Sequence, residues 1–244
     1  MEDELIVNPL SWDEQGVPHS VFFDDKYFCK ENGYEETLYV SCQGNKLQER
    51  FSALDPTQPG TFTIIETGFG TGLNFCCAWS VWDQCAPKSW KLHFISLELY
   101  PLLTDELSRA LSLWEPLQKY RAQLIKAYQP KTNTIDHLHL DDGRVIVTIV
   151  FDDILKALAI MHEQRLAPEG ADAWFLDGFA PSKNPLMWAD AVYAGMAKLS
   201  KPGTTLATFT VAGFVRRGLE AQGFEVFKAL GYGTKKHILT GVFK

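Results

Sequence analysis

The sequence predicts a doubly wound α/β fold, in which helices cover both faces of a mostly parallel sheet. Strand and helix signals alternate from Thr61 onward, and a chain of 244 residues is long enough to bury a large core without disulfides or metals. Successive strands joined by helices run parallel, because the crossovers are right-handed and both faces need cover. The last two strand signals are instead joined by the short turn Gly231-Tyr232-Gly233, which predicts an antiparallel last strand.

The composition excludes several classes of protein. Hydrophobic residues make up 46% of the chain and charged residues 22%, as in globular proteins. No apolar run approaches the ~18 residues of a membrane span, and the acidic start Met1–Glu4 lacks the basic and apolar segments of a signal peptide. The five cysteines are an odd number without a CxxC pair, which argues against a disulfide framework or a zinc ribbon. We therefore expect a cytoplasmic protein without a membrane partner.

Residues 1–58 are expected to form a small β-rich appendage packed on the core. Short β-prone runs occur at Val21–Phe28 and Glu36–Val40, with the turn signal Asn32-Gly33 between them. The segment Asp55–Gly60 contains two prolines and cannot continue regular structure well. We therefore place a boundary there and expect a second domain over residues 59–244.

Each element of the second domain has a local signal. Strands are expected at short runs of apolar or β-branched residues, and helices where apolar residues recur every three or four positions. Proline and glycine mark the ends: Pro116 separates two helices, Asn184-Pro185 begins one, Lys201–Gly203 precedes a strand, and Gly223 follows a helix. In chain order the expected elements are strand Thr61–Glu66, helix Leu73–Trp82, strand Leu92–Glu98, helices Leu103–Trp114 and Leu117–Tyr128, strand Val145–Phe151, helix Ile154–Met161, strand Ala173–Leu176, helix Asn184–Leu199, strand Thr204–Thr210, helix Phe214–Ala221, and strands Phe224–Leu230 and Ile238–Phe243.

A glycine-rich loop follows the first of these strands, at the edge of the sheet where such folds bind ligands. Its sequence is Glu66-Thr67-Gly68-Phe69-Gly70-Thr71-Gly72-Leu73-Asn74, and its three glycines let the backbone approach a ligand closely. A dinucleotide fingerprint would need glycine where Leu73 stands. The pattern instead resembles the loop of S-adenosylmethionine-dependent methyltransferases, whose cationic cofactor favours a carboxylate such as Glu66. A tight glycine turn without a ligand is the alternative.

Acidic residues at the next strand ends extend the expected cofactor site. Glu98 ends the second strand, where a carboxylate is placed to accept both ribose hydroxyls. Asp152 and Asp153 follow the third strand, and we expect one to accept the adenine amine while the other caps the helix, with Asp153 favoured for adenine and Ile154 against the ring. The expected cofactor-binding residues are Glu66, Gly68, Phe69, Gly70, Gly72, Asn74, Glu98, Asp152, Asp153 and Asp177.

Asp177 is the expected catalytic residue. It follows the fourth strand within the run Asp172–Pro185, where an acidic residue is followed by glycine, an aromatic residue and proline. Methylation of an amine needs a neutral nitrogen held in position, and a carboxylate at this place is suited to orient the amine and take its proton. Phe179 is a candidate surface for stacking a base, or a core residue. The alternative for Asp177 is a cap of the next turn.

At this point the motifs resemble those of a known family, the methyltransferase domain of the bacterial tRNA 5-methylaminomethyl-2-thiouridine biosynthesis proteins. The resemblance covers essentially the whole chain. It is carried by five segments, which are Phe23–Phe28, Glu66–Phe75, Asp172–Trp188, Ala207–Leu219 and Gly231–Lys236.

The resemblance implies transfer of a methyl group from S-adenosylmethionine to the aminomethyl substituent of a wobble uridine in tRNA. It places the family's catalytic aspartate on Asp177 and its cofactor loop on Glu66–Gly72. Bifunctional members continue into a flavin-dependent oxidase domain, whereas this sequence stops at Lys244 without a second glycine fingerprint. An FAD domain is therefore not expected within the chain, and an oxidase partner is either fused in a longer protein or separate. Asp152 also departs from the family, which has glycine there.

Basic residues near the expected active edge are candidates for contact with the tRNA anticodon region. The formal net charge of −7 excludes general capture of nucleic acid by charge, but a local positive rim is still compatible with it. Solvated surface charges are the alternative for each of these residues. The candidates are Lys183, Arg216, Arg217, Lys235 and Lys236, and Phe69 and Tyr232 join Phe179 as candidates for stacking a base. His137 and His139 lack a partner at metal-ligand spacing, so no metal is expected.

Three other functions are alternatives to the tRNA methyltransferase. The first keeps the cofactor but acts on the amine of a small molecule or a protein. The second is a nicotinamide-dependent oxidoreductase, which Leu73 and the lack of a tyrosine–lysine pair argue against. The third is a binding module without catalysis, which the intact glycine loop and Asp177 disfavour.

Overall fold

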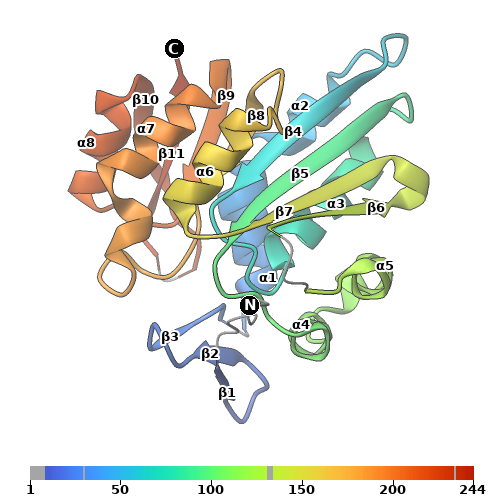
Figure 1. Ribbon diagram of the computed structural model, residues 1–244, viewed down its shortest axis with the longest axis vertical. Helices are drawn as coiled ribbons and strands as arrows, with labels where there is room; N and C mark the ends of the chain where they lie inside the picture. The colour runs from blue at the N-terminus through green and yellow to red at the C-terminus, as the bar shows by residue number, and fades with distance from the viewer. Residues whose placement is uncertain (1–8, 30, 131–133, 234) are drawn as a thin grey trace.

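An eight-stranded sheet organises the computed structural model, which describes residues 9–29, 31–130, 134–233 and 235–244 (Figure 1). The strand order is β10-β11-β9-β8-β4-β5-β7-β6. Neighbours among β4, β5, β7, β8 and β9 pair in parallel, while β11 is antiparallel to both β9 and β10, and β6 is antiparallel to β7. The strands are β4 (Gly60–Glu66), β5 (Trp90–Glu98), β6 (Ile135–Leu140), β7 (Val145–Phe151), β8 (Ala171–Phe175), β9 (Ser200–Thr208), β10 (Phe224–Leu230) and β11 (His237–Phe243). The predicted doubly wound sheet with an antiparallel last strand is confirmed.

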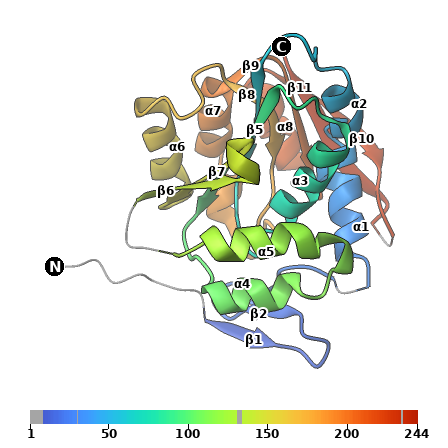
Figure 2. The same ribbon diagram turned by 90° about the vertical axis from the view of Figure 1, so that its right-hand side faces the viewer.

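Helices cover both faces of this sheet and enclose two hydrophobic cores (Figure 2). One core lies under α3, α5 and the helices that precede β4, and includes Phe75, Phe94 and Leu124. The other lies under α6, α7 and α8, and includes Trp174, Met196 and Leu219. These helices are α3 (Leu73–Cys85), α4 (Thr104–Leu111), α5 (Gln118–Ala127), α6 (Ile154–Glu163), α7 (Asp190–Lys198) and α8 (Gly213–Ala221).

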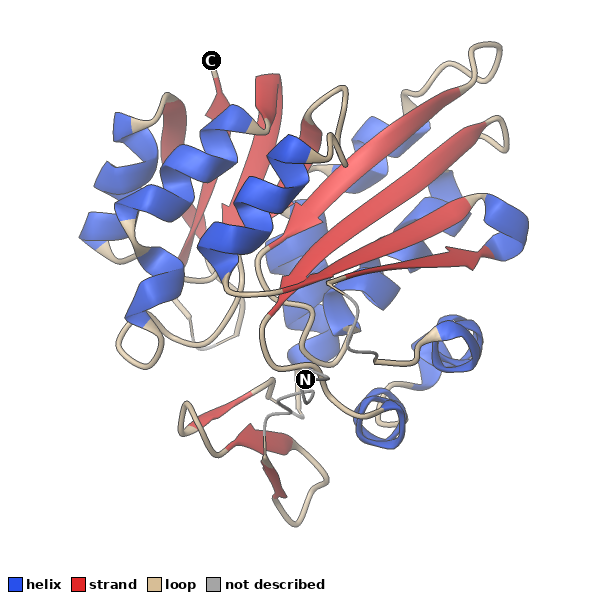
Figure 3. Cartoon of the chain, viewed as in Figure 1, coloured by secondary structure: helices blue, strands red, loops and turns tan. Residues whose placement is uncertain are grey.

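The N-terminal region only partly matches the expected β-rich appendage (Figure 3). A small antiparallel sheet of β1 (Leu10–Trp12), β2 (Pro18–Ser20) and β3 (Asp25–Lys26) is present. The prediction of a β-run at Glu36–Val40 is wrong, because residues 33–52 form α1 (Gly33–Thr37), the π-helix η1 (Leu38–Gln43) and α2 (Leu47–Ser52). Leu47 and Phe51 are fully buried in the first core, so tertiary packing overrides local β-propensity here. The boundary between residues 58 and 59 stays a prediction.

Three further elements differ from expectation. The segment Lys201–Gly203 does not precede the fifth parallel strand but belongs to β9, where the pairing with β8 is irregular between Ala171 and Ala173. The helix expected from Asn184 is divided into the short η4 (Pro185–Trp188) and α7, with Ala189 extended between them. The antiparallel edge strand β6 adds to the expected strands.

The structure also bears on the expectations about the N-terminus, membrane spans, metal sites and cysteines. Met1–Glu4 and Thr234 of the closing turn lie outside the described residues. Within the described ranges, no helix is both long and apolar enough to cross a membrane. The same ranges contain no group of three or more His, Cys, Asp or Glu side chains arranged to hold a metal ion. All five cysteines are free.

Candidate cofactor and catalytic site

A pocket of about 500 Å³ lies at the carboxyl ends of the parallel strands. It opens beside the neighbouring strands β4 and β8, from which the strand order runs outward in opposite directions, and this is the switch point at which such sheets bind ligands. The loops after β4, β5, β7 and β8 contribute most of its lining, and the N-terminal sheet closes one side. As expected, residues that follow four different strands therefore come together in one pocket.

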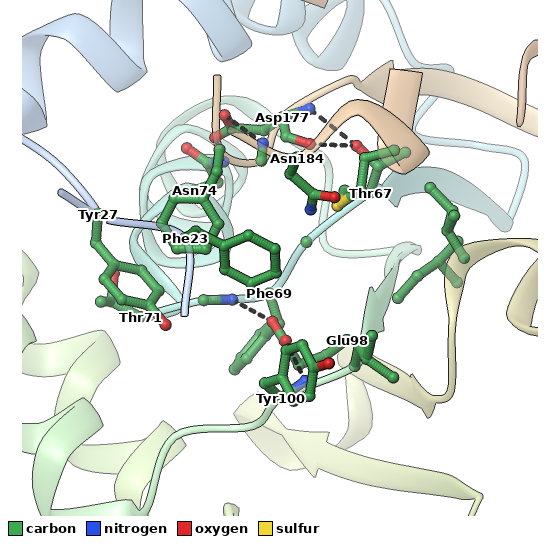
Figure 4. A pocket seen from close by; sticks show the side chains of 18 of the residues that line it. Phe23, Tyr27, Thr67, Phe69, Thr71, Asn74, Glu98, Tyr100, Asp177 and Asn184 are labelled. Atoms are coloured by element: carbon green, nitrogen blue, oxygen red, sulfur yellow. Dashed lines mark hydrogen bonds between the residues drawn. The ribbon is translucent and has the colours of Figure 1, made fainter. Parts of the chain in front are cut away.

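Asn74 and Asp177 line the bottom of the pocket (Figure 4), and Glu66 lies beneath them; we term these three residues the floor. The Asn74 side chain, in the first turn of α3, donates from Nδ2 to Glu66 Oε1 at 2.7 Å and to Asp177 Oδ2 at 2.6 Å. Ser96 Oγ donates to Glu66 Oε2 at 2.8 Å, and the Gly178 N–H donates to Asp177 Oδ1 at 2.8 Å. One amide thus joins the ends of β4 and β8 through two carboxyl groups.

The Thr67 side chain fixes the backbone of Asp177. Its hydroxyl donates to the Asp177 carbonyl oxygen at 2.6 Å and accepts the Asp177 N–H at 3.0 Å. The Thr67 N–H donates in turn to the carbonyl oxygen of Phe175 in β8. The catalytic candidate is therefore held by both its main chain and its side chain, which is the preorganisation that a positioning role requires.

Burial sets the electrostatics of the floor. It raises the pKa of Glu66 well above its ordinary value, against the opposing effect of the Ser96 and Asn74 hydrogen bonds. Burial also raises the pKa of Asp177, while its hydrogen bonds with Asn74 and Gly178 and the nearby Lys235 act in the opposite direction. Glu66 is fully buried and lies beneath the pocket rather than in its wall, so its expected direct contact with the cofactor is replaced by contact through Asn74.

The glycine loop leaves room at the place where a ligand must approach. A Cβ added to Gly68 would lie 3.9 Å from its nearest neighbours outside the loop, Gly178 Cα and Met187 Cε. It would therefore enter the open pocket. Gly70 and Gly72 have φ of 50° and 73°, which other residues adopt only with strain. Gly72 precedes α3 and is not in the pocket wall, so its role is in the turn.

Glu98 lies in the pocket wall at the end of β5, as expected for a ribose-binding residue. Its Oε2 accepts the Gly70 N–H and its Oε1 accepts the Tyr100 N–H, each at 2.8 Å. These bonds orient the carboxylate and leave lone pairs on both oxygens for hydroxyl donors. Burial raises the pKa of Glu98, while the backbone hydrogen bonds oppose that shift.

Of the two acidic residues after β7, the one favoured for adenine, Asp153, is the helix cap. Asp153 is the cap of α6, because its Oδ1 accepts the N–H groups of Leu155 and Lys156 at 2.9 and 3.2 Å. Asp152 accepts the Asp153 N–H and the Lys156 ammonium on Oδ1, and no described residue donates to its Oδ2. Both residues line the pocket together with Ile154, and Asp152 is now the better candidate for the adenine amine.

The N-terminal sheet forms what we term the roof, residues 10–28. Phe23 stacks on Phe179 with ring centroids 4.7 Å apart, and Tyr27 contacts Phe179 edge-on at 5.1 Å. The Ala180 N–H donates to Asp25 Oδ2, which ties the roof to the loop after β8. Phe179, a candidate for stacking a base, is therefore a pocket residue whose ring already has aromatic partners (Figure 4).

The other stacking candidates and the basic candidates are dispersed. Phe69 lines the pocket but stacks on Tyr128 in the first core, and Tyr232 contacts Tyr39 outside the pocket wall. Lys183 is paired with Asp24 of the roof at 2.7 Å. All five basic candidates, Lys183 included, lie outside the pocket wall. Arg216 pairs with Glu220, Lys235 pairs with Glu36 and lies over the Phe209 ring, and Arg217 and Lys236 are exposed.

Five residues of the site were not predicted in these roles from the sequence. Phe23, Tyr27 and Tyr100 reach the pocket through contacts between distant segments, for which the sequence offers no local signal. Thr67 and Asn184 stand inside motifs that were recognised, yet their site roles depend on the fold. The signal that could have indicated Thr67 is its place directly after the strand that ends in Glu66.

The pocket fits S-adenosylmethionine on its own chemistry. The open space at Gly68 accommodates a group in close contact with the backbone, and carboxylates face the pocket from three strand ends at Glu98, Asp152 and Asp177. An acidic pocket favours a cofactor that carries a sulfonium and an ammonium, and disfavours a pyrophosphate. The residues that would hold it are the Gly68–Gly70 backbone, Glu98, Asp152 and Ile154.

Comparisons with known proteins agree with this fit. A model of a family described as S-adenosyl-L-methionine-dependent methyltransferase matches residues 115–244. The tRNA 5-methylaminomethyl-2-thiouridine biosynthesis bifunctional protein MnmC of Ectopseudomonas mendocina (strain ymp) is 47% identical over 235 residues, which cover 96% of this chain and 35% of that protein. The protein of the same name from Chromobacterium violaceum is 48% identical over 232 residues, with 95% and 34% covered. The chain thus spans about a third of the length of these curated relatives.

A solved structure shares the fold. The crystal structure of MnmC2 from Aquifex aeolicus superposes with a TM-score of 0.74 at 19% identity, covering 99% of this chain and 72% of that chain. At this level of identity the likeness concerns the fold. It confirms the predicted class of α/β sheet.

Proposed function

The chain belongs to the family of S-adenosyl-L-methionine-dependent methyltransferases, and from this premise we propose that it methylates the primary amine of 5-aminomethyl-2-thiouridine at the wobble position of tRNA. The product would be 5-methylaminomethyl-2-thiouridine, the nucleoside in the names of the curated relatives. The observation that carries the proposal is the Asp177 carboxylate, fixed at the floor of a cofactor-sized pocket beside Gly68.

The bound cofactor supplies an electrophilic methyl carbon, and the residues of this chain prepare the amine. Asp177 is suited to accept a hydrogen bond from an N–H group of the amine, which leaves the nitrogen lone pair free to form the new bond. When the N–C bond forms and the S–C bond breaks, the nitrogen becomes cationic and loses one proton. The pKa of Asp177, raised by burial, brings this carboxyl group closer to the range in which it takes that proton and passes it to water.

We propose that the substrate reaches the pocket from the side of Phe179 and the loop after β8. A wobble base must leave its stack to enter an enclosed site, and aromatic rings such as Phe179 compensate for that loss. Lys183, Arg216, Arg217, Lys235 and Lys236 are proposed contacts to the anticodon region, on the basis of their charge alone. We also propose that an FAD-dependent oxidase, fused or separate, supplies the free amine. The relatives are named bifunctional and are about three times as long as this chain, which supports a second activity beside the methyl transfer.

Mass spectrometry of wobble nucleosides tests the proposal directly. The chain is incubated with isotope-labelled S-adenosylmethionine and tRNA that carries 5-aminomethyl-2-thiouridine, and we expect the label in the methylamino nucleoside. Asp177→Asn should lower kcat by about 10²–10⁴-fold and keep the cofactor affinity, because the amide cannot take the proton. The matched control is Asp105→Asn, an exposed position on α4.

Two results would contradict this assignment. An Asp177→Asn enzyme with the wild-type rate would remove Asp177 from catalysis. Methylation of small amines without methylation of tRNA would favour the second candidate, an amine methyltransferase for small molecules or proteins. A steep loss of tRNA methylation with salt, and none for small amines, separates the two acceptor classes.

A further inference from the structure

Asn184 is a polar residue of the pocket whose side chain has no hydrogen-bond partner within the described part of the chain. Its side chain lines the pocket, and Figure 4 draws it in the same cavity as Asp177 and Thr67. The residue is only 9% exposed. Among the described residues, none forms a hydrogen bond with its amide group, and the side chain does not cap η4, which follows it.

The turn that carries Asn184 does not depend on this side chain. The Asn184 N–H donates to the Ala180 carbonyl oxygen at 2.9 Å, and its own carbonyl accepts the Met187 N–H at 3.3 Å. The Trp188 indole N–H donates to the Phe179 carbonyl at 3.0 Å and anchors the loop from inside. The Asn184 amide therefore has no structural role in this turn, and it faces the pocket with its hydrogen-bonding groups available to a ligand.

We propose that Asn184 and Asp177 accept hydrogen bonds from the two N–H groups of the acceptor amine and thereby limit the reaction to one methyl group. This inference rests on the proposed function. A neutral primary amine has two N–H bonds and one lone pair. Two acceptors, Asn184 Oδ1 and an Asp177 oxygen, would each accept a hydrogen bond from one N–H group, and the lone pair would stay free for the methyl group.

The same arrangement disfavours a second transfer. The first transfer forms an N–C bond and breaks the S–C bond, and the cationic nitrogen then gives one proton to Asp177 and on to water. The product has a single N–H bond. To expose its lone pair again, it would have to turn its new methyl group toward Asn184 or Asp177 and leave a polar group in the enclosed pocket unpaired. Such a mismatch lowers the rate by an order of magnitude or more.

Product analysis with Asn184 variants tests the inference. In Asn184→Ala we expect kcat/KM for the first methylation to fall about tenfold and dimethylated nucleoside to appear at about a tenth of the product or more. Asn184→Asp keeps an acceptor oxygen and should form only the monomethyl product, at a reduced rate. Ser182→Ala, exposed in the same loop, is the matched control and should behave like the wild type.

Binding and melting measurements separate this role from others. The Kd of S-adenosylmethionine, measured by titration calorimetry, should change by less than about twofold in Asn184→Ala, and the Tm should stay close to the wild type. A tenfold weaker cofactor affinity with only monomethyl product would assign Asn184 to the cofactor and overturn the inference. Wild-type product ratios in Asn184→Ala would overturn it as well. If the wild type itself forms no methylated nucleoside, the proposed function fails and the inference falls with it.

Discussion

The floor and the roof of the pocket are built by opposite physical means. Burial raises the pKa values of the floor carboxyl groups Glu66 and Asp177. In the roof, hydrogen bonds from the Val17 N–H and Lys26 lower the pKa of Asp13, and the hydrogen bond from Lys183 lowers the pKa of Asp24. The floor depends on enclosed hydrogen bonds that have no substitute, whereas the roof depends on exposed ion pairs and ring contacts. Changes in the floor should therefore affect stability and chemistry, and changes in the roof mainly binding.

The largest effect is expected for Asn74→Ala. The substitution removes the amide that donates to Glu66 and to Asp177, and leaves both carboxyl groups without that donor. We expect the free energy of unfolding to fall by about 2–3 kcal/mol and kcat to fall by roughly 10²-fold or more. Urea denaturation and nucleoside analysis measure the two quantities. Ser80→Ala on the same helix loses only a bond to the Cys77 carbonyl and is the control. Equal effects for the two variants would contradict a special role of the floor.

The next effect is expected in the roof, for Phe23→Ala. This variant loses the stack on Phe179 and the contact with Tyr100. We expect about 1 kcal/mol of destabilisation and a roughly tenfold increase in the KM for the cofactor or tRNA, with kcat largely kept. Steady-state kinetics checks this, with Phe227→Ala, an exposed position on β10, as the control. A loss confined to kcat would mean that the roof contributes to the chemistry itself.

The pH dependence of stability sharpens the comparison further. Because the folded pKa of Glu66 lies above its unfolded value, its contribution to stability is fully present below the unfolded pKa and is lost as the pH rises through the folded pKa. Glu66→Gln cannot ionise, so its unfolding free energy should fall less steeply than that of the wild type between about pH 5 and about pH 8. Urea denaturation across this range measures both slopes. Identical slopes for wild type and variant would contradict the buried state of Glu66, and exposed Glu115→Gln serves as the control.

The smallest effect is expected for Lys183→Met. The ion pair with Asp24 is exposed, with the two side chains 41% and 78% accessible, so its loss should cost less than about 1 kcal/mol. If Lys183 leaves Asp24 to bind a tRNA phosphate, the salt dependence of tRNA binding should fall by about one unit of slope. Lys201→Met is the control, because Lys201 is similarly exposed and paired but lies at the opposite edge of the sheet. An unchanged slope would mean that Lys183 does not contact tRNA and only links the roof to the loop after β8.

The floor was largely predictable from the sequence, and the roof was not. Glycine spacing and apolar runs mark where strands β4 and β8 end, so the neighbourhood of Gly68 and Asp177 follows from local patterns and one topological rule. The contact between Phe23 and Phe179 joins residues more than a hundred positions apart, and no local pattern encodes it. The same holds for Asn74 as the donor between two acids, because an amide in a helix carries no sign of its distant partners.

The errors in the fold have a similar origin. Glu36–Val40 contains residues that favour strands in isolation, yet the neighbouring helices bury Leu47 and Phe51 against the sheet, and that burial decides the backbone conformation. At Asp152 and Asp153 the sequence offered two carboxylates for two roles. Only the backbone geometry at the start of α6 decides which of them becomes the cap.

The amide of Asn74 differs from every group it holds, because it gains or loses no proton at any pH at which the chain stays folded. The direction of its two hydrogen bonds is therefore permanent, from nitrogen to oxygen at Glu66 and at Asp177. A carboxamide that donates to both acids cannot relay a proton between them, so a proton arriving at Asp177 has no path through Asn74 to Glu66. In the proposed reaction, the proton taken up by Asp177 would therefore leave outward through the pocket, and the buried side of the floor would be the same at the start of every turnover.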